Sequence, residues 1–75
     1  MTKYELHQLL KIADNVEKKV YMTAGNGSLR LEIDLNFRDK QLLVYTDQME
    51  HKQFQELFFE NIYKSVDEWH MEEVI

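Results

Sequence analysis

The chain has 75 residues, a formal net charge of −5 and no cysteine. This length provides one hydrophobic core, and the lack of cysteine excludes disulfides and thiolate metal sites, so we expect a single domain, residues 1–75, from a reducing compartment. The longest uninterrupted apolar run has four residues, far fewer than the roughly 20 that a membrane span needs, and no signal-peptide pattern begins the chain, which predicts a cytoplasmic protein.

Residues 2–18 are predicted to form an amphipathic helix. Thr2 followed by Glu5 is the pattern of a capping box, in which each side chain bonds the backbone amide of the other residue. Apolar residues then recur at helical spacing and would face the core. This stripe consists of Leu6, Leu9, Leu10, Ala13 and Val16.

Three strands are expected to follow, over residues 20–24, 29–37 and 41–46. The middle strand carries the most regular pattern, because every odd position in it is apolar and every even position is polar. Side chains alternate between the two faces of a strand, so this pattern predicts a sheet with one buried face. Two glycines before the middle strand suit a hairpin turn, and residues 38–40 form a polar break after it. The third strand is apolar on both faces, which leaves open which of them is buried.

Residues 48–72 are predicted to form the last helix. Asp47 followed by Glu50 is a second capping-box pattern. The predicted fold is therefore α+β in two layers, ordered α-β-β-β-α, with a three-stranded antiparallel meander covered on one face by two helices. The core stripe of the last helix consists of Phe54, Leu57, Phe58, Ile62, Val66 and Trp69.

No pattern of catalytic or ligand-binding residues is present in the chain. The three histidines fall near predicted helix ends, and the spacing of His70 and Glu73 would supply only two metal ligands. Lysines of the first helix alternate with acidic residues, which disfavours a basic surface for nucleic acid. We therefore expect no enzymatic activity, no cofactor, no metal ion and no direct contact with nucleic acid or membrane.

The negative charge is concentrated in the last part of the chain. Residues 1–46 carry seven Lys/Arg and six Asp/Glu, whereas residues 47–75 carry two Lys and eight Asp/Glu. Such an excess is either a solvated face that keeps the protein soluble or a surface for a basic partner, which charge complementarity would attract and select. Pairing of these carboxylates with the chain's own Lys or Arg would remove the second interpretation. The predicted partner-binding residues are Glu60, Tyr63, Asp67, Glu68, Trp69, Glu72 and Glu73.

The layout of the chain, with the aromatic and acidic stretch at residues 58–73, resembles small phage-encoded inhibitors. The most similar in layout are anti-CRISPR proteins that block Cas9. That resemblance implies a mimic of nucleic acid, whose acidic side chains occupy the basic groove that would hold DNA. It predicts a non-enzymatic, phage- or mobile-element-encoded inhibitor of a host nucleic-acid-handling protein, acting in the host cytoplasm.

A second hypothesis is a homodimeric interaction module. It would assemble through the outer face of the sheet or through the edge of the strand at residues 41–46, because an unpaired strand exposes backbone groups that a second strand can bond. A small enzyme is a third possibility and would need a pocket that the sequence does not indicate.

Overall fold

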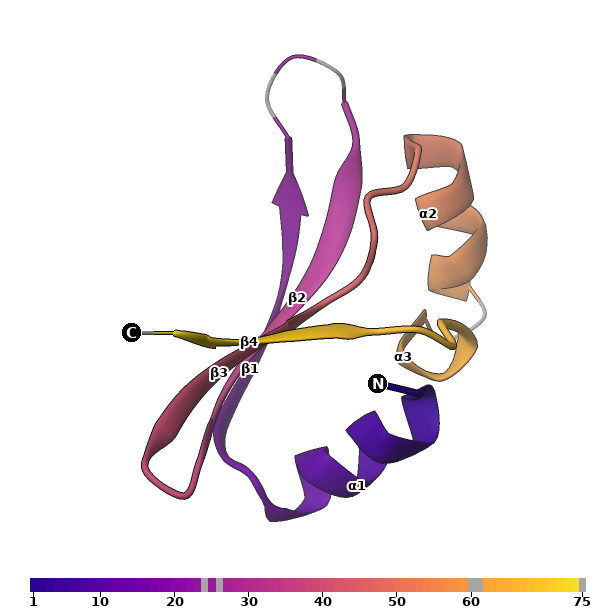
Figure 1. The fold of residues 1–75 in the computed structure, drawn as a ribbon. Helices are drawn as coiled ribbons and strands as arrows, with labels where there is room; N and C mark the ends of the chain where they lie inside the picture. The colour runs from indigo at the N-terminus through magenta and orange to yellow at the C-terminus, as the bar shows by residue number, and fades with distance from the viewer. Residues whose placement is uncertain (24, 26, 60–61, 75) are drawn as a thin grey trace.

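A four-stranded antiparallel sheet, with strands in the order β1-β2-β3-β4, carries helices on one of its faces (Figure 1). The computed structural model describes residues 1–23, 25, 27–59 and 62–74, and over them the fold class is α+β, as predicted. The elements in chain order are α1 (Lys3–Ile12), β1 (Asp14–Met22), β2 (Leu29–Phe37), β3 (Lys40–Tyr45), α2 (His51–Phe59), α3 (Ile62–Ser65) and β4 (His70–Val74).

The alternating stretch forms β2 with the predicted bounds. Its odd-numbered side chains point into the core, and its even-numbered ones point to the outer face of the sheet. β3 pairs with β2 in antiparallel register, with Val44 opposite Ile33 and Leu42 opposite Leu35. Because Leu42 and Val44 are buried, this register answers the question left open by the sequence: β3 turns Leu42 and Val44 inward and Leu43 and Tyr45 outward.

The first helix is shorter than predicted. The capping box is present: the Glu5 amide donates to the Thr2 hydroxyl at 3.1 Å, and the Thr2 amide donates to the Glu5 carboxylate at 3.2 Å. However, α1 ends at Ile12, so the helix predicted over 2–18 is wrong in its last turns. Those residues belong to β1, which is also longer than the strand predicted over 20–24.

The last predicted helix is also wrong as a single element. It divides into α2 and α3, and the segment that follows is extended and forms β4 along β3. The sheet therefore has four strands instead of three, and β3 is an inner strand. The predicted homodimer contact through the edge of that strand is excluded, because β4 occupies that edge.

The core lies between the helices and the inner face of β2 and β3. Leu6 of α1 and Trp69 are both buried, with 0% and 1% of their surface exposed. Trp69 is held in place by the N-terminal residues, because residues 1–3 run antiparallel to residues 67–69. The prediction that Trp69 is a core residue is thus confirmed, although its backbone is not helical. The partly buried residues packed against the core are Met1, Leu9, Leu10, Ala13, Phe37, Phe54, Leu57, Tyr63 and Val66.

The edge strand β1 lies outside this core. All nine of its residues are exposed, including those that share a face with the buried residues of β2. In the part of the chain that the structure describes, no helix combines the length and the apolar character needed to cross a membrane.

Candidate partner-binding groove

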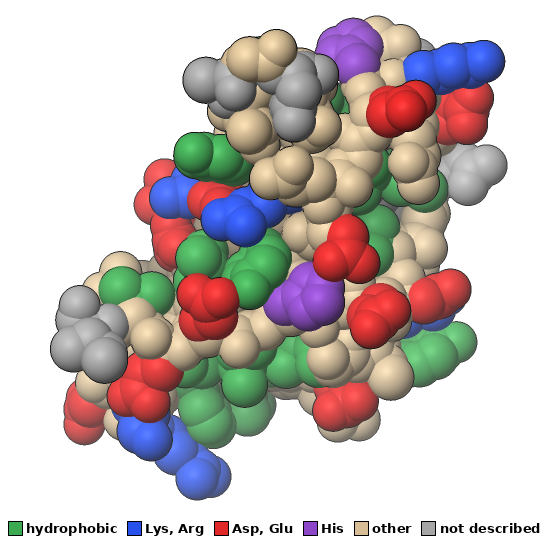
Figure 2. Space-filling model, turned by 45° about the horizontal axis from the view of Figure 1, so that its top comes forward, with side chains coloured by type: hydrophobic (Ala, Val, Ile, Leu, Met, Phe, Trp, Pro, Cys, Tyr) green, Lys and Arg blue, Asp and Glu red, His purple; other side chains and the backbone are tan. Residues whose placement is uncertain are grey.

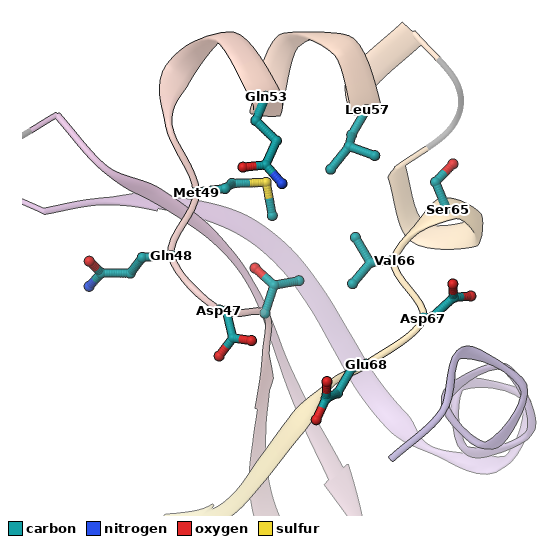
Figure 3. Close-up of a pocket in the computed structure, with 10 residues that line it drawn as sticks. Asp47, Gln48, Met49, Gln53, Leu57, Ser65, Val66, Asp67 and Glu68 are labelled. Carbon is teal, nitrogen blue, oxygen red and sulfur yellow. The ribbon is translucent and has the colours of Figure 1, made fainter.

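An open groove with a cavity volume of about 350 Å³ lies between two chain segments that flank α2 and β4 (Figure 3). One wall is the connection from β3 to α2, and the other is the connection from α3 to β4. We call this site the acidic groove. Its lining residues are Thr46, Asp47, Gln48, Met49, Gln53, Leu57, Ser65, Val66, Asp67 and Glu68.

The first wall is fixed by hydrogen bonds to β2. The Thr46 hydroxyl accepts from the Leu31 amide at 3.1 Å, and the Thr46 amide donates to the Leu31 carbonyl at 3.1 Å. Three residues later, Leu29 and Met49 exchange two backbone hydrogen bonds of 2.8 and 2.9 Å. These contacts bury Thr46 and Met49 and leave Asp47 between them exposed at the mouth of the groove.

The second wall is fixed by the N-terminal residues and by Trp69. The indole nitrogen of Trp69 donates to the Val66 carbonyl at 3.0 Å, which turns the chain sharply after α3. The Lys3 amide donates to the Asp67 carbonyl at 3.2 Å. Val66 therefore faces the groove, while Asp67 and Glu68 lie on its exposed rim (Figure 3).

The charged residues that line the groove are all acidic. None of the ten residues that line it is Lys, Arg or His. Asp67 forms an ion pair with Lys3 at 3.0 Å, and this contact raises the pKa of Lys3. Asp47 Oδ1 lies 2.6 Å from His70 Nε2, and Glu68 forms no ion pair with another described residue. Only one of these three carboxylates is thus paired with a Lys or Arg of the described chain.

The structure brings some of the predicted partner-binding residues together and separates others. Asp67 and Glu68 meet at the groove. Glu60 lies outside the described residues, as do the side chains of Phe58 and Ile62 from the predicted core stripe. Trp69 cannot be the surface anchor that was also predicted, because it is buried. Tyr63 is half-buried and stacks on the Trp69 ring at a centroid distance of 6.3 Å.

Glu72 and Glu73 do not join the acidic groove. They project from opposite faces of β4, because neighbouring strand residues alternate. Glu72 lies on the outer face opposite Leu43, and its carboxylate accepts a hydrogen bond from the Tyr45 hydroxyl at 2.6 Å. This contact raises the pKa of Tyr45. Glu73 lies on the inner face opposite Leu42.

Two features of the structure, one at the groove and one on the open face of the sheet, were not predicted from the sequence. Asp47 was predicted to cap a helix, but α2 begins at His51 and Asp47 lines the groove instead. On the open face of the sheet, the Arg30 guanidinium lies 5.3 Å from the Tyr21 ring and 4.5 Å from the Tyr45 ring. The alternation of β2 places Arg30 on that face, but only the register shows which aromatic rings lie beside it.

Among the described residues, no three His, Cys, Asp or Glu side chains are grouped so that they could hold a metal ion. Acidic and apolar side chains are exposed side by side over the face shown in Figure 2. Comparison of the chain with protein-family models, with curated proteins and with solved structures finds no match in any of the three.

Proposed function

We propose that the protein is a non-enzymatic binding protein that holds a basic segment of another protein in the acidic groove. The observation that carries the proposal is that Asp47, Asp67 and Glu68 line one groove that has an apolar floor and no basic lining residue, with Asp67 also paired to Lys3 outside the lining. These carboxylates come from two segments about twenty positions apart in the chain. The local order of the sequence alone does not bring them together.

A Lys or Arg side chain fits the chemistry of this groove. Such a side chain has a long apolar stem that packs on apolar surface and a charged end group. Met49, Leu57 and Val66 offer the apolar surface, and the rim carboxylates offer charged acceptors. Hydrogen bonds between ionised groups are roughly twice as strong as those between neutral groups. The groove therefore favours a basic residue over an apolar or acidic one.

The partner class that we propose is a nucleic-acid-handling protein of a host cell. Such proteins carry clustered Lys and Arg that contact phosphates, and an acidic surface is attracted to the same cluster. The resemblance to phage-encoded inhibitors supports this class, with the protein acting as an inhibitor that blocks the nucleic-acid site. The rim is small, so it would cover a few basic side chains rather than a long stretch of duplex.

The proposal is tested by charge reversal with a matched control. The groove variant is Asp67→Lys with Glu68→Lys, and the control is Glu50→Lys with Glu56→Lys, which changes the net charge equally at exposed sites outside the groove. The probes are a labelled Lys/Arg-containing peptide and the same peptide with Glu in the basic positions, measured by fluorescence anisotropy at several salt concentrations.

We expect the wild type and the control to bind the basic peptide, and the groove variant to lose both this binding and its salt dependence. An equal loss of peptide binding in both variants would show that only net charge matters and would overturn the proposal that the groove is the binding site. Inhibition of DNA cleavage by purified Cas9, lost in the groove variant and kept in the control, would support the partner class. A lack of inhibition in large molar excess would exclude Cas9 as the target.

A further inference from the structure

The edge strand β1 is the most exposed element of the sheet. All nine residues of β1 are exposed, and only one side of the strand is paired, by β2. Four of the eight large apolar side chains that are exposed among the described residues belong to β1. These four are Val16, Val20, Tyr21 and Met22. An edge strand with an apolar surface is a ready template for another strand.

The hairpin that joins β1 to β2 determines which backbone amides and carbonyls of β1 point to the free edge of the sheet. The Thr23 amide donates to the Ser28 carbonyl at 2.8 Å. Antiparallel pairing alternates along a strand, so the amides and carbonyls of Lys18, Val20 and Met22 point away from β2. These groups form the row that a further strand would bond.

Two of these apolar side chains, those of Val20 and Met22, lie on the inner face of the sheet, whereas Tyr21 lies on the outer face beside Arg30. Val20 stands opposite Leu31, and Met22 stands opposite Leu29. Leu29 and Leu31 are buried, whereas Val20 and Met22 are 52% and 62% exposed. The helices thus cover the inner face as far as β2 and leave the same face of β1 open.

The charges of β1 match a second copy of the same strand. An antiparallel pair with Lys18 on the two-fold axis places Glu17 of each copy opposite Lys19 of the other. It also places Val16 opposite Val20. Shifting the axis to Lys19 would set Lys19 against Lys19, and shifting it to Val20 would set Lys19 against Tyr21. The register centred on Lys18 is the one among these three that pairs opposite charges, which stabilise cross-strand neighbours.

The two Lys18 side chains that meet at this axis already have another contact. The Lys18 ammonium lies 4.4 Å from the centroid of the Tyr63 ring of its own chain. A cation is attracted to the face of an aromatic ring. This contact draws each charge away from the axis and toward α3, which reduces the repulsion between the two copies.

We propose that β1 pairs with β1 of a second copy in this register, so that the two sheets join into one. This interface is independent of the acidic groove, which lies on the other side of β2. It moves the dimer contact that the sequence suggested at the edge of residues 41–46 to the free edge of the sheet, because β4 occupies the former edge. A strand from an unrelated protein is the competing occupant.

The experiment is a charge exchange at the pair Glu17 and Lys19, read by sedimentation velocity over a range of concentrations. We expect the wild type to show a concentration-dependent dimer. Glu17→Lys and Lys19→Glu should each weaken it roughly tenfold or more, because two attractive pairs become repulsive. The double exchange should restore it, and a mixture of the two single variants should form a heterodimer. Glu73→Lys on β4 is the matched control and should leave the dimer unchanged.

Each single variant is checked for folding by circular dichroism, because Lys19 also forms an ion pair of 2.6 Å with Asp34. Restoration by the double exchange and by mixing does not depend on that ion pair. Hydrogen exchange provides a second readout, with the amides of Lys18 and Val20 slowed only in the dimer. A wild type that stays monomeric at high micromolar concentration would overturn the proposal. A dimer that keeps its strength in both single variants would overturn it as well.

Discussion

Met1 and Trp69 exchange two backbone hydrogen bonds across almost the whole length of the chain. The Met1 nitrogen donates to the Trp69 carbonyl at 2.6 Å, and the Trp69 amide donates to the Met1 carbonyl at 2.8 Å. This pair aligns the start of α1 with the start of β4 and seats the indole ring under the inner face of the sheet. The acidic groove and the core thus depend on the same contact.

Replacing Trp69 with alanine should remove a large part of the stability of the fold. Removal of a buried Trp costs about 3–5 kcal/mol, and a chain of this length has only about 4–11 kcal/mol in total. Urea unfolding followed by circular dichroism measures the loss. Tyr4→Ala is the control, because Tyr4 is 70% exposed and its change should stay within about 0.5 kcal/mol. Equal effects in the two variants would contradict the role of Trp69.

Replacing Thr46 with valine should destabilise the fold although the two side chains have nearly the same shape. The change removes the hydroxyl that accepts from the Leu31 amide and leaves that amide buried without its partner. The cost should be about 1–3 kcal/mol in the free energy of unfolding. Thr46→Ser keeps the hydroxyl and should recover the hydrogen bond, so a serine variant as unstable as the valine variant would argue against it.

The contact between Tyr45 and Glu72 should appear in a titration of the tyrosines. The hydrogen bond to the Glu72 carboxylate raises the pKa of Tyr45 above its ordinary value of 10.0. Its contribution to stability is therefore complete below pH 10 and is lost as the pH rises through the raised pKa of Tyr45. Glu72→Gln should lower the pKa of Tyr45, measured by NMR of the ring. An unchanged pKa would show that the contact does not form in solution.

The capping box of α1 should make stability depend on pH in the acid range. The Thr2 amide and hydroxyl lower the pKa of Glu5 below its ordinary value of 4.5. The ionised carboxylate thus stabilises the fold above about pH 4.5, and this contribution is lost as the pH falls through the lowered pKa of Glu5. Glu5→Gln should be less stable than the wild type near pH 7, and the difference should vanish at low pH. A difference that persists in acid would contradict this assignment.

Elements whose structure is set by residues close in sequence could be predicted from the sequence, whereas elements set by contacts between distant residues could not. β2 is central and buried on one face, so its alternation predicted the strand and its bounds. Thr2 and Glu5 predicted the start of α1 for a similar reason, because a capping box is local. The end of α1 was missed, because Ala13 and Val16 continue the helical spacing although they lie beyond Ile12.

The C-terminal part shows the opposite case. Trp69 fits the helical stripe of Phe54 and Val66, yet its burial comes from its pairing with Met1. The sequence of β4 does not alternate between apolar and polar residues, because no helix covers the inner side chains of this strand and they stay exposed. The groove could be predicted only in part: the excess of acidic residues indicated Asp67 and Glu68, whereas Asp47 joins them through contacts of its neighbours with β2.

The pairing of residues 1–3 with residues 67–69 also affects the order in which the parts of the fold form. The hairpins of β1, β2 and β3 join neighbours in sequence, whereas the contact of Met1 with Trp69 closes a loop of almost the whole chain, so the hairpins should form first. Before that contact forms, Leu6 of α1 can pack on the inner face of β2 and β3, but the Trp69 ring that completes the core is missing. Until then part of the apolar inner face of β2 is exposed, so a chain truncated before Trp69 should be cleaved faster by proteases than the whole chain.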